Sequence, residues 1–311
     1  MKKNNRVYGV IGIKSVMANW NADFNGKPKT TSNGDIFGSD KAFKYPIKKM
    51  WEAENEPVLY VKSYSYKGNG DKTTFQARTL GERFEEIFGK KVGEVKDKAE
   101  VIKQLFSAID VLNFGATFAE EKNNISITGA VQVGQGFNKY EDSNVETIDI
   151  LSPFVDSTKD DAQNTSIGKK IVSDEAHYMY PFSINPENYD IYTKEIEGLE
   201  GYTEEAYEKF KKACLVAATA YNTNSKAGCE NEFAFFVECK DGSKLYLANL
   251  DQYIEFVKNN EEKDMIDLTK LSEILSEDKI ENEIKNIEVF YNPYTTELKG
   301  VMPEYKVSSL I

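Results

Sequence analysis

"RVYGVIGIKSVM", residues 6–17, is the stretch that gives the first element of the fold. Its Val and Ile residues predict a β-strand. Gly9, Gly12 and Lys14 interrupt the apolar run and no small-residue cleavage site follows, so the stretch differs from a signal peptide. No segment approaches the roughly 18 consecutive apolar residues that a membrane span needs. The sequence therefore predicts a globular protein that begins with a strand and does not contact a membrane.

The order of the elements that follow indicates the fold class. Residues 39–54 form a predicted helix after the N-cap pair Ser39 and Asp40, and residues 203–221 form a second one after Thr203. Strands are predicted at 57–64, 111–118, 125–134, 177–184, 232–249 (a hairpin around Asp241-Gly242) and 287–291, and further helices at 78–90, 97–109, 251–259 and 268–276.

Without its insertions, the chain reads strand, helix, strand, strand, helix, strand. This order predicts an α+β fold with a ferredoxin-like palm, the arrangement that RNA-recognition domains use. An antiparallel sheet of this kind carries its helices on one face, so we expect the other face to be free for a ligand.

The charge of the chain is unevenly distributed. The 311 residues carry a formal net charge of −12, yet residues 1–50 contain ten Lys or Arg against three Asp. The other 261 residues sum to −19, and residues 251–311 alone hold fourteen acidic residues against seven lysines. Such asymmetry indicates that the basic part contacts a polyanion, although lysines that merely solvate a surface give the same pattern.

Few residues are suited to catalysis. His177, the one histidine, lies in a predicted strand, which favours a structural role and excludes histidine-based triads and HExxH zinc sites. Asp23, Asp35 and Asp40 could together hold a metal, but turn and capping roles explain them more simply. Three cysteines without CxxC spacing favour the reducing cytoplasm over a zinc or disulfide framework. The sequence predicts no metal, cofactor or active site.

The basic stretch "ANWNADFNGKPKTTSNGDIFGSDKAFKYPIKKMW", residues 18–51, is better suited to binding. Lys41, Lys44 and Lys48 are spaced by three and four, so they line one helix face. Ser39 and the first-turn amides offer a phosphate site. Amide, basic and aromatic side chains precede the helix: Asn19, Trp20, Asn21, Phe24, Lys27 and Lys29. This mixture suits single-stranded nucleic acid, where a stacked base contributes about 1–3 kcal/mol. Core packing is an equally good interpretation of Trp20.

Several segments together resemble a known family. "YGVIGIKSVMANWNADFNGKPKTTSNGDIFGSDKAFKYPIKKMW", "NFGATF", "ITGAVQVGQGFN", "SIGKKIVSDEAHYMYPFSINPENY" and "EEAYEKFKKACLVAATAYNTNSKAG" occur in one order. Through them the chain resembles the backbone subunit of type I CRISPR effector complexes (Cascade), in the subtype I-B branch of the repeat-associated mysterious protein superfamily. The resemblance implies one RNA-recognition-like domain over residues 1–311. Its implied parts are a finger insertion at about 19–110, a thumb at about 152–175 and an acidic C-terminal extension at about 251–311.

The resemblance also implies a non-catalytic function. Many copies would polymerise along CRISPR RNA beside other Cascade subunits, leaving the bases free to pair with target DNA. The residues implied or suited to meet the guide RNA are Lys14, Asn19, Trp20, Asn21, Lys27, Lys29, Ser39, Lys41, Lys44, Lys48, Gln132, Gln135, Asn138, Lys169 and Lys170. Residues 156–170 have almost no large apolar side chains, so we expect them to be mobile in the free subunit.

Two alternatives to a guide-RNA-binding subunit remain open from the sequence. One is a metal-dependent ribonuclease of the same superfamily, because related type III subunits cut RNA with a loop aspartate, although Asp23 or Asp35 does not by itself imply that activity. The other is a protein-only structural module whose lysines meet the acidic surface of another copy.

Overall fold

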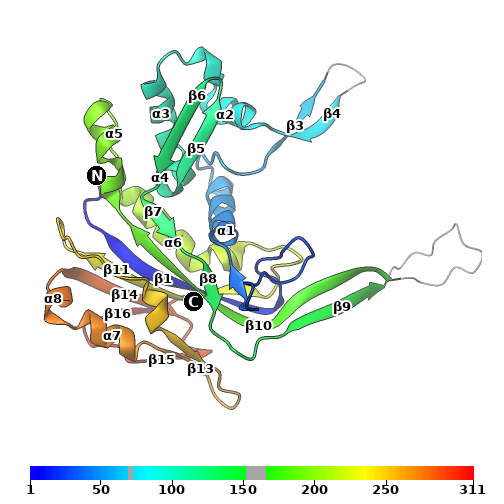
Figure 1. The fold of residues 1–311 in the computed structure, drawn as a ribbon, viewed down its shortest axis with the longest axis vertical. Helices are drawn as coiled ribbons and strands as arrows, with labels where there is room; N and C mark the ends of the chain where they lie inside the picture. Colours follow the sequence, from blue (N-terminus) through cyan, green and yellow to red (C-terminus); the bar gives the residue numbers. More distant parts are fainter. Residues whose placement is uncertain (69–72, 152–165) are drawn as a thin grey trace, which may run out of the picture.

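The computed structural model describes residues 1–68, 73–151 and 166–311 (Figure 1). Its largest sheet has the strand order β16-β14-β11-β1-β10-β8-β2, and β7 and β9 also pair with β10. In chain order these strands are β1 (Val7–Ala18), β2 (Phe37–Gly38), β7 (Val131–Val133), β8 (Gly136–Asn138), β9 (Val145–Leu151), β10 (Ser166–Ile184), β11 (Cys229–Cys239), β14 (Ile284–Tyr291) and β16 (Lys306–Ser309).

The middle of this sheet is antiparallel and two helices cover one of its faces. β1 lies between β10 and β11, and β7 and β8 pair with the far edge of β10. The covering helices are α1 (Asp40–Ala53) and α6 (Glu204–Ala220). Because side chains alternate along a strand, Val7, Ile11 and Ile13 of β1 all point into the core beneath these helices. The α+β fold class predicted from the sequence is therefore confirmed.

The opposite face of the sheet is covered as well, which contradicts the expectation of a free face. Tyr8 and Val10 of β1 belong to a second core that also contains Phe235 of β11. That core is completed by the C-terminal segment, for example by Ile266 and Leu271. The elements of the segment besides β14 and β16 are η4 (Leu250–Tyr253), β12 (Glu255–Val257), β13 (Asp264–Asp267), α7 (Thr269–Leu275), α8 (Asp278–Glu281) and β15 (Thr296–Lys299). This face of the sheet is therefore not free for a ligand.

A separate lobe lies between α1 and β7 in the chain. It consists of β3 (Tyr64–Lys67), β4 (Thr74–Ala77), α2 (Leu80–Phe88), η2 (Val92–Glu94), α3 (Lys98–Ser107), α4 (Ile109–Phe114), β5 (Gly115–Glu120) and β6 (Asn123–Thr128). β3 and β4 form a hairpin that projects from the body in Figure 1, and β5 and β6 form another two-stranded sheet. Phe84, Leu105 and Phe118 join the lobe to the core beneath α1 and α6.

A second projection is formed by β9 and the first part of β10 (Figure 1). The two strands pair from Val145 opposite Ser173 to Leu151 opposite Ser166. Most of the predicted thumb and of the segment expected to be mobile, residues 152–165, lies outside the described residues. After β10 the chain forms η3 (Pro186–Tyr189) and α5 (Asp190–Glu195) before α6 begins. In the described part of the chain, no helix is both long and apolar enough to cross a membrane.

Candidate nucleic-acid interface

A pocket of about 500 Å³ opens where the β9–β10 ribbon leaves the body of the protein. Four segments that are distant in sequence form its wall. These are the loop after β1, the first half of α1, the ribbon at Ile150 and at Lys169–Val172, and the chain after α6. Five of the predicted site residues line it: Asn19, Trp20, Asn21, Lys169 and Lys170.

Lys169 and Lys170 supply positive charge to this pocket. They lie on β10 opposite Asp149 and Ile148 of β9, and Lys169 is exposed while Lys170 is partly buried. Neither ammonium group forms an ion pair with a carboxylate of the described residues, although acidic residues outnumber basic ones in the chain. Two lysines at a concave surface, not neutralised by these carboxylates, are suited to bind an anion such as a phosphate.

Trp20 packs in the core and does not present its ring to a base. Its side chain is 1% exposed, and Nε1 donates a hydrogen bond of 2.6 Å to the Tyr180 hydroxyl. The space around the indole and the Tyr180 hydroxyl is filled. Even a Cβ atom added to the neighbouring Gly38 would lie 1.8 Å from that hydroxyl oxygen. This resolves the choice that the sequence left open, and it corrects the inclusion of Trp20 among stacking residues.

Asn19 and Asn21 hold the loop in place rather than projecting from it. The Asn19 amide donates to the carbonyl oxygens of Gly26 at 3.0 Å and Ile171 at 3.1 Å, and Asn19 is itself buried. Asn21 Oδ1 accepts a 2.8 Å bond from the backbone N–H of Ser39, which joins the loop to the start of α1. The side chains of both predicted RNA contacts therefore form hydrogen bonds within the protein that hold the pocket wall.

Three further residues of the pocket wall have a role that sequence reasoning missed. Lys226 Nζ donates to the backbone carbonyls of Asn19, at 2.7 Å, and Trp20, and burial lowers the pKa of Lys226. Tyr45 of α1 meets Tyr221 edge to face, with ring centroids 5.6 Å apart. These three residues lie in segments that carry the family resemblance. No local sequence pattern distinguishes them, because they come together only in the folded chain.

The α1 lysines differ in how freely they face solvent. Ser39 caps the helix as predicted, with Oγ accepting from the Ala42 N–H at 3.3 Å. Lys41 is exposed, whereas Lys44 pairs with Asp40 at 2.9 Å. Lys48 pairs at 3.4 Å with Asp110, which is fully buried, and burial lowers the pKa of Lys48. Two of the three lysines predicted to contact phosphates therefore already neutralise neighbouring carboxylates.

The remaining predicted residues are scattered around the sheet edge and the loop. Gln132 and Gln135 are exposed on and beside β7. Asn138 is committed to the backbone, since Oδ1 accepts from the N–H groups of His177 at 2.8 Å and Tyr140 at 3.1 Å. In the loop after β1, Lys27 is exposed and Lys29 lies 5.5 Å from the Phe37 ring.

The three aspartates considered for a metal site have separate local roles. Asp23 Oδ1 accepts the backbone N–H groups of Asn25 and Lys27 in a turn. Asp35 accepts the Thr31 hydroxyl at 3.0 Å, and Asp40 pairs with a lysine of α1. None of the three belongs to a metal-type cluster of described residues. The turn and ion-pair roles account for all of them.

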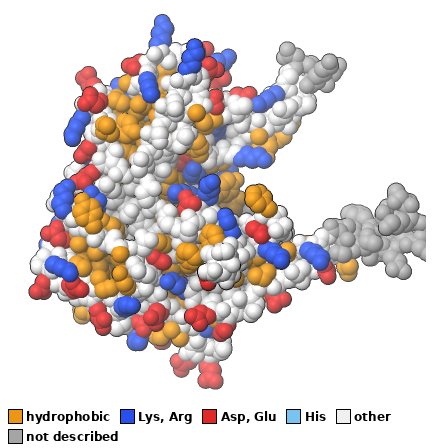
Figure 2. Space-filling view, viewed as in Figure 1, with side chains coloured by type: hydrophobic (Ala, Val, Ile, Leu, Met, Phe, Trp, Pro, Cys, Tyr) orange, Lys and Arg blue, Asp and Glu red, His pale blue; other side chains and the backbone are white. Residues whose placement is uncertain are grey.

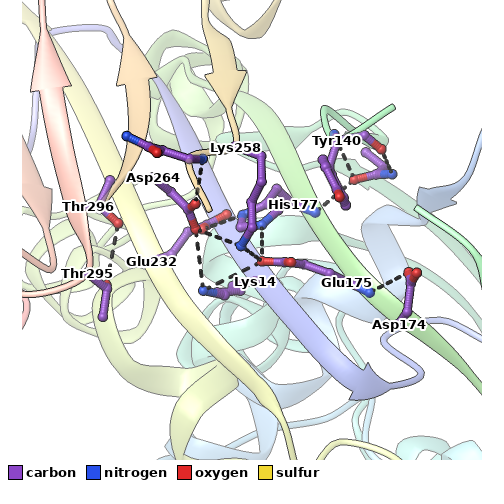
Figure 3. A network of polar contacts seen from close by, with 12 residues as sticks. Lys14, Tyr140, Asp174, Glu175, His177, Glu232, Lys258, Asp264, Thr295 and Thr296 are labelled. Atoms are coloured by element: carbon purple, nitrogen blue, oxygen red, sulfur yellow. Dashed lines mark hydrogen bonds and ion pairs between the residues drawn. The ribbon is translucent and has the colours of Figure 1, made fainter. Parts of the chain in front are cut away.

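A buried charge network joins the sheet to the C-terminal segment (Figure 3). His177 Nδ1 lies 2.7 Å from Glu232 Oε2, and Nε2 lies 3.1 Å from Glu175 Oε1. Burial lowers the pKa of His177, but the carboxylates of Glu232 and Glu175 outweigh it and raise the pKa to about 9. The His177 ring also stacks on Phe256 of β12, with centroids 3.6 Å apart. The imidazolium is thus a structural cation, as the sequence favoured.

Lys14 belongs to this network and not to the pocket. It follows Tyr8 and Val10 in the alternation along β1, so it lies on the sheet face that the C-terminal segment covers. Its ammonium group lies 3.8 Å from both Glu175 and Asp264, and Lys258 binds the same two carboxylates at 2.8 and 3.3 Å. Lys14, which the resemblance suggested as an RNA contact, is therefore held by two carboxylates of the network and does not line the pocket.

Glu175, His177 and Asp264 are the one group of described residues spaced as metal ligands are. Two lysines already neutralise the Glu175 and Asp264 carboxylates, and the His177 hydrogen bond is the main reason why the pKa of Glu175 falls to about 2. Three cations and three carboxylates balance one another here. The group is therefore an ion-pair network that attaches the C-terminal segment to the sheet.

Comparisons with known proteins place this architecture in a family. The profile of the family described as "CRISPR-associated protein Cas7" matches residues 5–275. No curated protein sequence matches the chain. The fold is similar to that of a chain in a solved "CRISPR RNA-guided surveillance complex, pre-nicking", with a TM-score of 0.56 and 13% identity over 97% of this chain and 96% of that one. A chain of a second "CRISPR RNA-guided surveillance complex" aligns over 94% of this chain and 95% of that one, at 14% identity and a TM-score of 0.43. The family match covers most of the sequence, and the chain therefore belongs to the Cas7 family of CRISPR-associated proteins.

Proposed function

We propose that this chain is a non-catalytic guide-RNA-binding subunit that polymerises along CRISPR RNA and forms the backbone of an antiviral, DNA-targeting Cascade complex. Its partners would be CRISPR RNA, other copies of itself, other Cascade subunits and, through the guide, target DNA. The observation that carries the proposal is the pocket at the base of β10, where Lys169 and Lys170 form no ion pair with a described carboxylate, in a member of the Cas7 family.

We also propose finer assignments within this function. The central antiparallel strands with α1 and α6 would be a ferredoxin-like palm, because the spatial order β11-β1-β10-β7/β8 is that of a strand-helix-strand-strand-helix-strand unit. Residues of about 19–110 would contribute the fingers, about 152–175 the thumb, and about 251–311 an acidic extension. Subtype I-B and a location in the cytoplasm are part of the same proposal.

The candidate residues divide into two groups by their accessibility. Those with exposed or partly exposed polar ends would contact RNA: Lys27, Lys29, Lys41, Gln132, Gln135, Lys169 and Lys170. Those held by internal bonds would position them: Asn19, Asn21, Ser39, Lys44, Lys48 and Asn138. Phosphates are the expected target of the lysines, because backbone contacts fix register without reading base sequence.

The experiment is a titration of single-stranded RNA at several salt concentrations with the K169A/K170A variant. Each lost phosphate contact should reduce the log–log salt slope by about 0.7, so the variant should be shallower by about 1.4. The matched control is K279A/K306A, which removes two exposed lysines from the C-terminal segment and should keep the parental slope. Equal slopes for the parent and K169A/K170A would contradict the pocket assignment. If K169A/K170A instead weakens the self-association of the protein measured without RNA, the result would favour a protein-only module.

The non-catalytic part of the proposal has its own test. Purified protein incubated with labelled RNA and Mg²⁺ should leave the RNA intact, since Asp23, Asp35 and Asp40 have separate turn or ion-pair roles. Cleavage that disappears in Asp35→Ala would overturn it in favour of a nuclease.

A further inference from the structure

The β3–β4 hairpin carries three exposed aromatic side chains on one face. Tyr66 pairs with Phe75 and Tyr64 with Ala77, and residues opposite each other in an antiparallel pair share a face. Phe75 lies 5.2 Å from Tyr64 and 5.1 Å from Tyr66, measured between ring centroids. The three side chains are nevertheless 43%, 75% and 61% exposed for Tyr64, Tyr66 and Phe75. The other face of the hairpin is polar: Ser65, Lys67, Thr74 and Gln76.

This aromatic face continues a series of lysines and rings that begins on α1. Lys48 Nζ lies 5.5 Å from the Tyr60 ring centroid, and Lys62 Nζ lies 5.0 Å from that of Tyr64. Lys62 is exposed and forms no ion pair with any carboxylate in the described ranges. Lys48 is neutralised by Asp110, so Lys62 is the cation of this series that can meet a phosphate. Cations suit phosphates and ring faces suit bases, which is the combination that sequence-tolerant single-strand binders use.

The orientation of the hairpin supports the same ligand. Figure 2 shows hydrophobic and basic side chains on the side of the β3–β4 arm that faces the hollow between this arm and the β9–β10 ribbon. The pocket with Lys169 and Lys170 lies at the base of that ribbon. A strand held at the pocket would therefore lie in a hollow that the β3–β4 arm borders on its other side.

We propose that Tyr64, Tyr66 and Phe75 form a stacking platform for unpaired bases of a single-stranded nucleic acid, as a second contact besides the pocket. The inference rests on the proposed function, because it takes the chain to bind single-stranded nucleic acid. It adds a different type of contact: the pocket binds phosphate, whereas the platform binds bases and is tolerant of their identity. RNA and DNA both have the required chemistry, so the experiment includes both.

The test compares three ligands of equal length: a uridine RNA, a thymidine DNA and an abasic sugar-phosphate strand. One stacked base corresponds to roughly a 5- to 150-fold change in affinity. We therefore expect Y66A/F75A to bind the RNA or the DNA at least about 5-fold more weakly, with an unchanged salt slope. Binding of the abasic strand should be the same as for the parent. A loss with RNA alone would assign the platform to a guide-type strand, and a loss with DNA would extend it to a DNA strand.

The conservative variant Y66F/F75Y keeps both rings and should bind like the parent. Cross-linking of 5-iodouridine RNA to the parent protein provides a second readout, with adducts expected at the three platform residues. Three results would overturn the proposal: parental affinity in Y66A/F75A, an equal loss on the abasic strand, or a change only in self-association without nucleic acid. If K169A/K170A still flattens the salt slope of RNA binding in that case, only the platform fails and the proposed function stands.

Discussion

The His177 network predicts a stability that depends on pH in a definite direction. The folded pKa of about 9 lies above the ordinary value of 6.5, so the folded protein holds this proton more tightly than the unfolded chain. The stabilisation is complete below pH 6.5 and is lost as the pH rises through 9. A shift of this size corresponds to about 3 kcal/mol, of which about 2 kcal/mol should disappear between pH 6 and pH 8.5.

Chemical denaturation at constant ionic strength measures this change directly. The chain is well suited to it, because His177 is its one histidine and histidine is the side chain that ordinarily titrates in this range. The series stops at pH 8.5 because the cysteines begin to affect stability above it. Burial raises their pKa values in the folded protein, that of Cys239 to about 11, so their thiols ionise first in the unfolded chain and favour unfolding. An unfolding free energy that is constant or increases from pH 6 to pH 8.5 would refute the reasoning.

Two variants separate the network from other causes. His177→Gln leaves Glu232 and Glu175 without their shared cation, so we expect a loss of about 3–5 kcal/mol at pH 6 and no remaining pH dependence over this range. The double variant H177Q/E232Q removes one charge of each sign and should be less destabilised than the single variant. If either variant keeps the parental pH profile, another group is responsible for it.

Three further predictions concern parts of the fold that the sequence left open. Trp20→Ala should reduce the unfolding free energy by about 3–5 kcal/mol in chemical denaturation, because it empties a filled core site; a change below about 1 kcal/mol would contradict core packing. Lys48→Ala should destabilise the protein by more than about 1 kcal/mol, since it leaves the buried Asp110 carboxylate without a cation, whereas Lys41→Ala should stay within about 0.5 kcal/mol; equal melting temperatures would refute the difference. Deleting residues 251–311 should expose the second core, so light scattering should report aggregation; a stable, monodisperse truncated protein would show that the sheet face does not need its cover.

Helices were the elements that the sequence predicted best. Predicted helices at 39–54, 78–90, 97–109 and 203–221 correspond to α1, α2, α3 and α6 within a few residues. Their start signals are local, and the structure contains the corresponding bonds. Thr203, for example, accepts the Ala206 N–H at 3.1 Å. A cap and a 3.6-residue periodicity need no knowledge of the rest of the chain.

Strand predictions failed where a distant partner decided the conformation. Residues 57–64 are apolar enough for a strand, but the N–H groups of Leu59 and Tyr60 donate to the Asp110 carboxylate instead of to a neighbouring strand. Residues 111–118 divide into the end of α4 and the start of β5. One helix prediction failed in the same way, because residues 251–259 form η4 followed by β12, which pairs with β13. Each of these segments is ambiguous by itself.

The predicted hairpin at 232–249 was correct only in its first half. Gly242 adopts a positive φ of 75°, as the Asp241-Gly242 signal indicates, but no second strand returns from it. β11 pairs instead with β14, which lies some fifty residues later in the chain. The resulting C-terminal cover on the sheet explains why the expected binding face was wrong. The pocket on the other side of the molecule could not be predicted from any one segment, because four segments form it.

The most direct measurement is the mass of the complexes formed on CRISPR-type RNAs of increasing length, determined by native mass spectrometry. If the subunit polymerises along the guide, the number of copies should rise in whole steps in proportion to RNA length. K169A/K170A should need a higher protein concentration for each step, because it lacks two proposed phosphate contacts. Complexes that hold one copy at every RNA length, or oligomers of the same size with and without RNA, would contradict a guide-RNA-binding backbone subunit.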